Sequence, residues 1–232
     1  MDLTAAELVG ARLRRHGAGV LLDLDGTLVD SEPTNRAAFA TYFARRGWDV
    51  PHETLMRFAG RRGTEVLAEL DGPWAGEDPV TLADEIVACL DPEATPPVPV
   101  PGAADAVAAW RRAGVPISLV TSARHDWAVE ALEMLGVADL GLAMVTAESV
   151  AVGKPDPEPF LRGADALGLD PADCLAFEDT PAGLAAALGA GVGLVVGVRT
   201  SHPDAVLREA GAHASVPDMT ALVPAVSGEA RT

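Results

Sequence analysis

Two carboxylates stand two residues apart directly after a short apolar run near the start of the chain. The run at residues 20–22 leads into Asp23 and Asp25, and Gly26 follows at once. Such a run, bounded by Asp and Gly, is typical of a buried parallel strand that ends in a turn. Side chains alternate along a strand, so both carboxylates are expected on one side, where they repel each other unless a cation or a proton intervenes. The pair predicts either a catalytic site or a solvated turn.

Three further segments place polar residues directly after short apolar runs or in a tight loop. Thr121 and Ser122 follow the second apolar run, and Glu178 and Asp179 end a third. Lys154 stands between them in the loop Gly-Lys-Pro-Asp-Pro. Because ligands in open α/β sheets bind at the carboxyl ends of the strands, these residues are expected to gather at one sheet edge.

The lysine is informative because it is the only one in the chain. The other 16 basic residues are all arginine. A lysine ammonium is a compact point charge, whereas an arginine guanidinium is a wide planar fork. A narrow site that holds a phosphate beside a carboxylate favours the point charge. The alternative is a single lysine left by chance on the surface.

The four segments together resemble the motifs of the haloacid dehalogenase-like hydrolases, most of which are phosphatases. The stretch from Asp23 to Glu32 is similar to their first motif, and the others follow in the expected order. The resemblance implies that Asp23 is a nucleophile that forms an aspartyl-phosphate. It implies that Asp25 protonates the leaving group and then activates water, and that Thr27 orients Asp25. Asp25 also argues against dehalogenation, because the dehalogenating branch lacks an acid there.

Metal binding is expected at the same cluster of acids. Carboxylates without a nearby His or Cys suit Mg²⁺, which prefers oxygen ligands. The expected ligands are the carboxylates of Asp23 and Asp179 and the backbone carbonyl of Asp25. Glu178 is either a further ligand or a residue that supports the ligands, and the Glu-Asp pair could instead only cap the following helix.

Substrate contacts are predicted from both sides of the site. Thr121, Ser122 and Lys154 are expected to bind the phosphate, although Thr121 and Ser122 could also be ordinary helix caps. Arg61 and Arg62 lie in a Gly-Arg-Arg-Gly loop that faces the active site in the family. They could hold sugar hydroxyls or a second anionic group, or they could be solvated surface arginines.

The element pattern predicts an α/β fold. After residue 102, helical and strand-like segments alternate, which indicates a Rossmann-like parallel sheet with helices on both faces. Residues 33–90 show only helical patterns, and a proline-rich stretch, 91–102, follows them. We therefore predict a catalytic core, residues 1–31 and 98–232, with an inserted all-helical cap domain, which we call the cap segment, residues 32–97. The predicted strands are one ending at residue 23, then 116–120, 144–145, 175–177 and 193–198. The predicted helices include 4–17, 64–70, 79–90, 103–112, 125–135, 157–167 and 181–188.

The resemblance favours a Mg²⁺-dependent phosphatase of a small phosphorylated metabolite. The Arg loop and the segment after Glu178 look most similar to sugar-phosphate phosphatases of the 2-deoxyglucose-6-phosphatase sort. A β-phosphoglucomutase-like isomerase is one alternative, but Asn35 stands where those enzymes have a histidine. Asn35 is otherwise expected to contact the substrate. Phosphoglycolate remains a second alternative, because residues of the cap segment decide the substrate.

Composition excludes several classes of partner. The formal net charge of −17 disfavours binding to nucleic acid or to anionic membranes. The sequence has no run of 18 apolar residues, so no membrane span is expected, and the N-terminus lacks the features of a signal peptide. Two cysteines, Cys89 and Cys174, are expected to be free thiols. We therefore expect a cytoplasmic protein that is a monomer or a small homo-oligomer.

Overall fold

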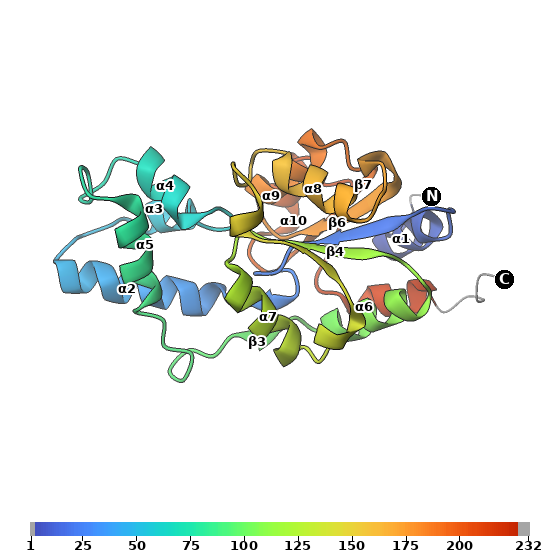
Figure 1. The fold of residues 1–232 in the computed structure, drawn as a ribbon, viewed down its shortest axis with the longest axis horizontal. Coiled ribbons are helices and arrows are strands. Elements are labelled where there is room, and N and C mark those ends of the chain that lie inside the picture. The colour runs from blue at the N-terminus through green and yellow to red at the C-terminus, as the bar shows by residue number, and fades with distance from the viewer. Residues whose placement is uncertain (1–2, 227–232) are drawn as a thin grey trace.

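A six-stranded parallel sheet forms the centre of the larger part of the molecule (Figure 1). The computed structural model describes residues 3–226. The strand order is β5-β4-β1-β6-β7-β8, so β1 lies in the middle between β4 and β6. The strands are β1 (Gly19–Leu22), β4 (Ile117–Val120), β5 (Ala143–Val145), β6 (Cys174–Glu178), β7 (Leu194–Val198) and β8 (Ala214–Val216). The predicted α/β class with a Rossmann-like parallel sheet is confirmed.

Helices cover both faces of this sheet because its strands are apolar on both faces. Val20 and Leu22 of β1 point into one hydrophobic cluster, and Leu21 between them points into the other. The first face is covered by α1 (Ala5–Leu13), α6 (Ala103–Arg112) and α7 (His125–Met134). The second is covered by α8 (Glu158–Ala166), α9 (Pro181–Gly189) and α10 (Asp204–Glu209). Short 3₁₀ helices lie at Ala138–Leu140, Ala147–Ser149, Pro171–Asp173 and Thr220–Val226.

The cap segment consists of helices with a hydrophobic cluster of their own. Its helices are α2 (Glu32–Arg46), α3 (His52–Met56), α4 (Gly63–Glu69) and α5 (Pro79–Val87). Aromatic side chains fill the cluster; for example, Phe43 stacks on Trp74 with ring centroids 5.6 Å apart. The helices stand at one end of the molecule, beyond the carboxyl ends of the strands (Figure 1). This separate cluster agrees with an inserted helical cap, while the boundaries at 31/32 and 97/98 stay a prediction.

Two short segments connect the core with the cap segment, and they pair with each other. Val29–Asp30 (β2) and Val98–Pro99 (β3) form a short antiparallel ladder that the sequence analysis missed. The hydroxyl of Thr34 also donates to the carbonyl of Thr95, at 2.8 Å. The proline-rich stretch is thus a turn followed by a paired strand, because the neighbouring crossing offers backbone partners.

Element ends differ from the predicted ones by a few residues. The capping box of Thr4 and Glu7 is present, but α1 ends at Leu13 rather than at Gly17, because Arg14 already closes the helix. Helix α5 begins at Pro79 after its Asp78 cap and ends at Val87 instead of residue 90. The short elements α10 and β8 were missed, since neither is long enough to show a periodic pattern. No helix within residues 3–226 is long and apolar enough to cross a membrane.

Candidate active site

The predicted motif residues meet at the carboxyl ends of three adjacent strands. Asp23 directly follows β1, Thr121 directly follows β4, and Glu178 is the last residue of β6. Because β4, β1 and β6 are neighbours in that order, their ends bring these side chains together from distant parts of the sequence. All three residues are buried. The parallel sheet therefore creates the site that the spacing of the motifs predicts.

Lys154 is fully buried and joins all three of these strand ends. Its Nζ donates to Oδ1 of Asp23 at 2.6 Å, to Oε1 of Glu178 at 2.7 Å and to the Val120 carbonyl at 2.9 Å. Burial alone would lower the pKa of Lys154, but the charges of Asp23 and Glu178 outweigh it and raise that pKa. Lys154 is therefore a permanent cation within the acid cluster, and its placement by chance on the surface is excluded.

Glu178 is held on both sides of its carboxylate. Oε1 accepts from Lys154, and Oε2 accepts from the backbone N–H groups of Asp179 and Thr180 at 3.0 and 3.1 Å. Gly183, in the first turn of α9, makes room for this carboxylate, since an added Cβ there would lie only 1.7 Å from Oε1. Glu178 thus supports both the lysine and the start of the helix. Whether it is also a metal ligand stays a prediction.

Three carboxylate oxygens beside this network lack a hydrogen-bond partner in the described chain. They are Oδ2 of Asp23 and both oxygens of Asp179, and all three are buried. Carboxylate oxygens of Asp23, Glu178 and Asp179 lie within 4.8 Å of one another. Burial, followed by the charges of Asp23 and Glu178, raises the pKa of Asp179 well above its usual value and outweighs the opposing effect of the nearby Ser201 hydroxyl. Buried anionic oxygens without partners are costly, and a divalent cation with oxygen ligands would relieve this cost. The donor set therefore fits a metal ion.

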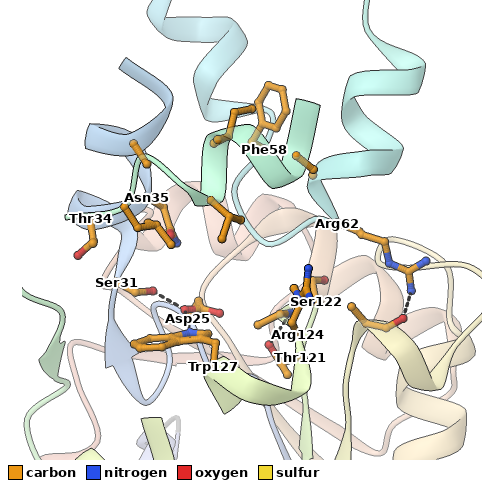
Figure 2. Close-up of a pocket in the computed structure, with 18 of the residues that line it drawn as sticks. Asp25, Ser31, Thr34, Asn35, Phe58, Arg62, Thr121, Ser122, Arg124 and Trp127 are labelled. Carbon is orange, nitrogen blue, oxygen red and sulfur yellow. Dashed lines mark hydrogen bonds between the residues drawn. The ribbon is translucent and has the colours of Figure 1, made fainter. Parts of the chain in front are cut away.

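Asp25 is held by contacts that the sequence analysis did not anticipate. Its Oδ1 accepts from the hydroxyl of Ser31 and from the indole N–H of Trp127, the latter at 2.8 Å (Figure 2). The expected contact from Thr27 is wrong, because Oγ1 of Thr27 is buried and has no partner in residues 3–226. Burial raises the pKa of Asp25 to about 6. The hydrogen bond from Ser31 lowers this pKa, and the charge of Asp23 raises it further. A carboxyl in this range suits a group that both gives and takes a proton near neutral pH.

The two predicted hydroxyl donors have different surroundings. Thr121 is buried, and its Oγ1 accepts from the amide of Ala123 at 3.0 Å, which leaves the hydroxyl proton free to donate. The backbone N–H of Thr121 is occupied by the Val145 carbonyl of β5. Ser122 instead donates from Oγ to the carbonyl of Gly60 in the cap segment, at 3.1 Å. Thr121 therefore faces the acid cluster, whereas Ser122 contacts the cap segment.

The Gly-Arg-Arg-Gly loop lies over this edge of the sheet, but its arginines are already paired. Arg61 donates to Glu69 of the cap segment. Arg62 donates to the core carbonyls of Ala147, at 2.6 Å, and Val150, at 3.2 Å, and one of these bonds is drawn in Figure 2. Both side chains contact a cavity of about 1100 Å³ between core and cap segment that also reaches Asp23, Asp25 and Asn35. The loop thus faces the active site as expected, with its charges engaged by the protein itself.

Comparison with known proteins agrees with this geometry. A family model described as haloacid dehalogenase-like hydrolase matches residues 18–191, which include all four motifs. The chain belongs to the haloacid dehalogenase-like hydrolase family. The predicted family is thereby confirmed.

Relatives within this haloacid dehalogenase-like family include named phosphatases. The chain is 38% identical to a validoxylamine A 7'-phosphate phosphatase of Streptomyces hygroscopicus subsp. limoneus, over 82% of this chain and 89% of the relative. It is 36% identical to hexitol phosphatase A of Escherichia coli K12, over 75% of this chain and 79% of the relative. A solved hydrolase structure from Pseudomonas syringae shares the fold, with a TM-score of 0.81, 24% identity, and coverage of 92% and 99%. Family and relatives together confirm the predicted enzyme class, a hydrolase of phosphoric monoesters.

Three residues of this haloacid dehalogenase-like chain lie near the reacting carboxylates without having been predicted there. Ser31 and Trp127 hold Asp25, and Glu32 lies beside them in the cavity. Burial and the nearby charge of Asp25 raise the pKa of Glu32 to about 7. Ser31 and Glu32 stand within the first motif, so their position in the sequence was a usable signal. Trp127 comes 102 residues after Asp25, and only the fold brings the two together.

Proposed function

We propose that the chain is a Mg²⁺-dependent phosphatase that hydrolyses a phosphorylated sugar or polyol through an aspartyl-phosphate on Asp23. The observation that carries this proposal is the pairing of Asp23 with Lys154 at 2.6 Å, beside three buried carboxylate oxygens that have no geometrically aligned hydrogen-bond partner among the described residues. One oxygen of Asp23 is held by the lysine, and the other faces the acid cluster. Mg²⁺ would be held by the carboxylates of Asp23 and Asp179 and by the backbone carbonyl of Asp25, and it would supply charge stabilisation for the phosphoryl group.

Asp23 attacks phosphorus in this mechanism, and the ester oxygen leaves. Asp25 gives its proton to the leaving oxygen and then takes a proton from the water that hydrolyses the aspartyl-phosphate. Its raised pKa of about 6 suits this double role. The charge of Lys154 stabilises the phosphoryl oxygens, and the hydroxyl of Thr121 donates to one of them. Glu178 orients Lys154 through its 2.7 Å contact and is not needed as a direct metal ligand.

The alternatives have weaker support. Phosphoglycolate would need a cation for its second anionic group, and the arginines of the cavity are paired with acids or carbonyls. A mutase is disfavoured by Asn35, which occupies the position of the expected histidine and contacts the cavity. The two phosphatase relatives act, by their names, on validoxylamine A 7'-phosphate and on hexitol phosphates, which supports a polyhydroxylated substrate. We further propose the predicted domain boundaries, a cytoplasmic location and a monomeric or small homo-oligomeric state.

The test is phosphate release from a panel of phosphate esters, measured with Mg²⁺ and again with a chelator. The panel holds hexose, hexitol and pentose phosphates, glycerol phosphate and phosphoglycolate. We expect release that depends on the metal and is largest with sugar or polyol phosphates. Preferred hydrolysis of phosphoglycolate, or interconversion of hexose phosphates without release, would contradict the proposal. Release that is unaffected by the chelator would contradict the proposed dependence on Mg²⁺.

A further inference from the structure

The cavity above Asp25 has an apolar wall that the chemistry described so far does not use. On α5, Val80 and Val87 are 57% and 48% exposed, and Leu90 just beyond the helix is 39% exposed. On α7, Met134 is 42% exposed, seven residues after Trp127. All five side chains contact the same cavity. We call them the apolar wall.

Helix α5 carries apolar residues on two different faces. Leu82 and Ile86 are buried in the cluster of the cap segment and account for the packing of the helix. Val80 and Val87 lie on another face and have no such role. Helix α7 has the same arrangement, since Ala128, Ala131 and Leu132 face the core while Met134 does not. Four of the eight large hydrophobic side chains exposed in the described residues thus line this one cavity, and exposed apolar side chains that gather beside a site mark a place where something binds.

The wall reaches the reacting groups through Trp127, and Asp84 and Glu130 of the same two helices also line the cavity. Trp127 belongs to it and donates from its indole to Asp25, which is placed to protonate the leaving oxygen. From Trp127 to Met134, and likewise from Val80 to Val87, the helix rise covers about 10 Å. Figure 1 shows α5 on the cap side and α7 on the core side, and Arg124 joins them through Asp84 at 3.3 Å. The wall thus leads away from the point where a leaving group departs.

We propose, resting on the proposed function, that the apolar wall binds the leaving group, and that the substrate is a phosphate monoester whose organic part extends beyond one sugar ring into an apolar group. A second anionic group is disfavoured at the cavity, because seven acidic side chains line it against four arginines. The cavity, at about 1100 Å³, is slightly larger than the roughly 300–1,000 Å³ common for ligand pockets. A sugar phosphate alone would leave the apolar wall in water.

The experiment compares two substrates that differ only at the far end, glucose 6-phosphate and phenyl β-glucoside 6-phosphate. We expect kcat/KM to be at least about tenfold higher for the phenyl glucoside, since a buried apolar group gives a factor of this size. In Val87→Ser and in Met134→Gln this ratio should fall toward one. Leu161→Gln is the matched control, because Leu161 is 45% exposed on α8 and does not contact the cavity. It should keep the ratio of the unaltered protein.

Each other outcome overturns the inference in a recognisable way. Equal kcat/KM for the two esters in the unaltered protein would show that the wall does not bind the leaving group. An equal loss for both esters in Val87→Ser and Met134→Gln, with circular dichroism unchanged, would assign the wall to cap closure instead. If neither ester nor p-nitrophenyl phosphate released phosphate, the proposed function itself would fail, and this inference with it.

Discussion

The acid cluster at the sheet edge and the apolar wall of the cavity differ in how firmly their side chains are held. Lys154 and Glu178 are completely buried; Lys154 donates to groups at three strand ends, and Glu178 accepts from Lys154 and from the backbone at the start of α9. Val80, Val87 and Met134 are each more than two-fifths exposed and contact mainly an open cavity. A change in the first region disturbs charges that balance one another, whereas a change in the second alters only what touches the substrate.

This difference separates chemistry from selectivity. Removing one partner from a buried ionic network leaves another charge unpaired, so such positions tolerate little change. Exposed apolar positions can change with small effects on stability. The fold therefore fixes phosphoryl transfer at one edge of the sheet and leaves the choice of substrate to the surfaces of α5 and α7.

The largest effect is expected from Asp23→Asn. Asparagine keeps the volume and a contact with Lys154 but removes the nucleophile, so phosphate release should fall more than about 1000-fold. The free energy of unfolding should change little, because Lys154 remains paired with Glu178 and one of the crowded negative charges is lost. Phosphate release and thermal unfolding measure the two quantities.

Asp105→Asn is the control for this change, because Asp105 is an exposed acid in the first turn of α6. It should retain full turnover. Turnover by Asp23→Asn at even a tenth of the rate of the unaltered protein would contradict the proposed nucleophile and would weaken the contrast between the two regions.

A smaller effect is expected when the metal cluster alone is changed, by Asp179→Asn. Both oxygens of Asp179 lack partners in the described chain, and its pKa is raised by burial and by neighbouring charges. The variant should be at least as stable as the unaltered protein without metal, since a repulsive charge is gone. Millimolar Mg²⁺ should raise the melting temperature of the unaltered protein but not that of the variant.

Calorimetry with and without a chelator measures this difference. A Mg²⁺-dependent rise of equal size in Asp179→Asn would remove Asp179 from the metal site. Loss of stability in the metal-free variant would instead mean that the carboxylate has a structural partner, and the electrostatic account of the cluster would then be wrong.

Trp127 lies where the two regions meet, and Trp127→Phe should have an effect of intermediate size. The change keeps an aromatic ring on α7 but removes the N–H that donates to Asp25 at 2.8 Å. Loss of one hydrogen bond to a charged group predicts a decrease in kcat of about tenfold, with KM changed less. Steady-state kinetics on a sugar phosphate separates the two constants.

Trp110→Phe is a matched control for this change. Trp110 is buried against Phe177, and its indole N–H has no partner among residues 3–226. Removing that N–H should leave kcat unaltered. Equal kcat for the two variants would show that the contact between Trp127 and Asp25 is incidental.

Trp127 also marks the limit of what the sequence could predict. Asp23, Lys154 and Asp179 were found because each stands in a recognisable local pattern, and parallel strands necessarily bring their ends together. The contact between Trp127 and Asp25 depends instead on how α7 lies against the sheet, which no local pattern encodes. The contact predicted between Thr27 and Asp25 was wrong for the same reason. Thr27 is near Asp25 in the sequence, but it is Trp127, distant in the sequence, that donates to Asp25 in the fold.

The fold shows the same division between local and distant information. Most helices had periodic patterns and the buried central strands had short apolar runs, and both were predicted within a few residues. The ladder of β2 and β3 was not, because each of its strands is two residues long and is stabilised only by the other. Likewise, Arg62 was expected at the substrate from its loop position, whereas its hydrogen bonds go to carbonyls about 85 residues away.

The smallest effect is expected from Arg62→Met, which tests how the cap segment rests on the core. Arg62 donates to the carbonyls of Ala147 and Val150, and its partner Glu65 accepts from the amide of Gly153, next to Lys154. Without the guanidinium the cap segment should close less readily over the substrate, so KM should rise about threefold to fivefold while kcat changes less.

Arg57→Met is the matched control for this change. Arg57 is exposed, and among the described residues its side chain pairs only with Glu69 of the cap segment. The KM of this variant should be within about twofold of that of the unaltered protein. If both variants raised KM equally, general loss of positive charge would explain the effect. A rise confined to Arg62→Met would show that selectivity depends on where the cap segment meets the lysine loop as well as on the apolar wall.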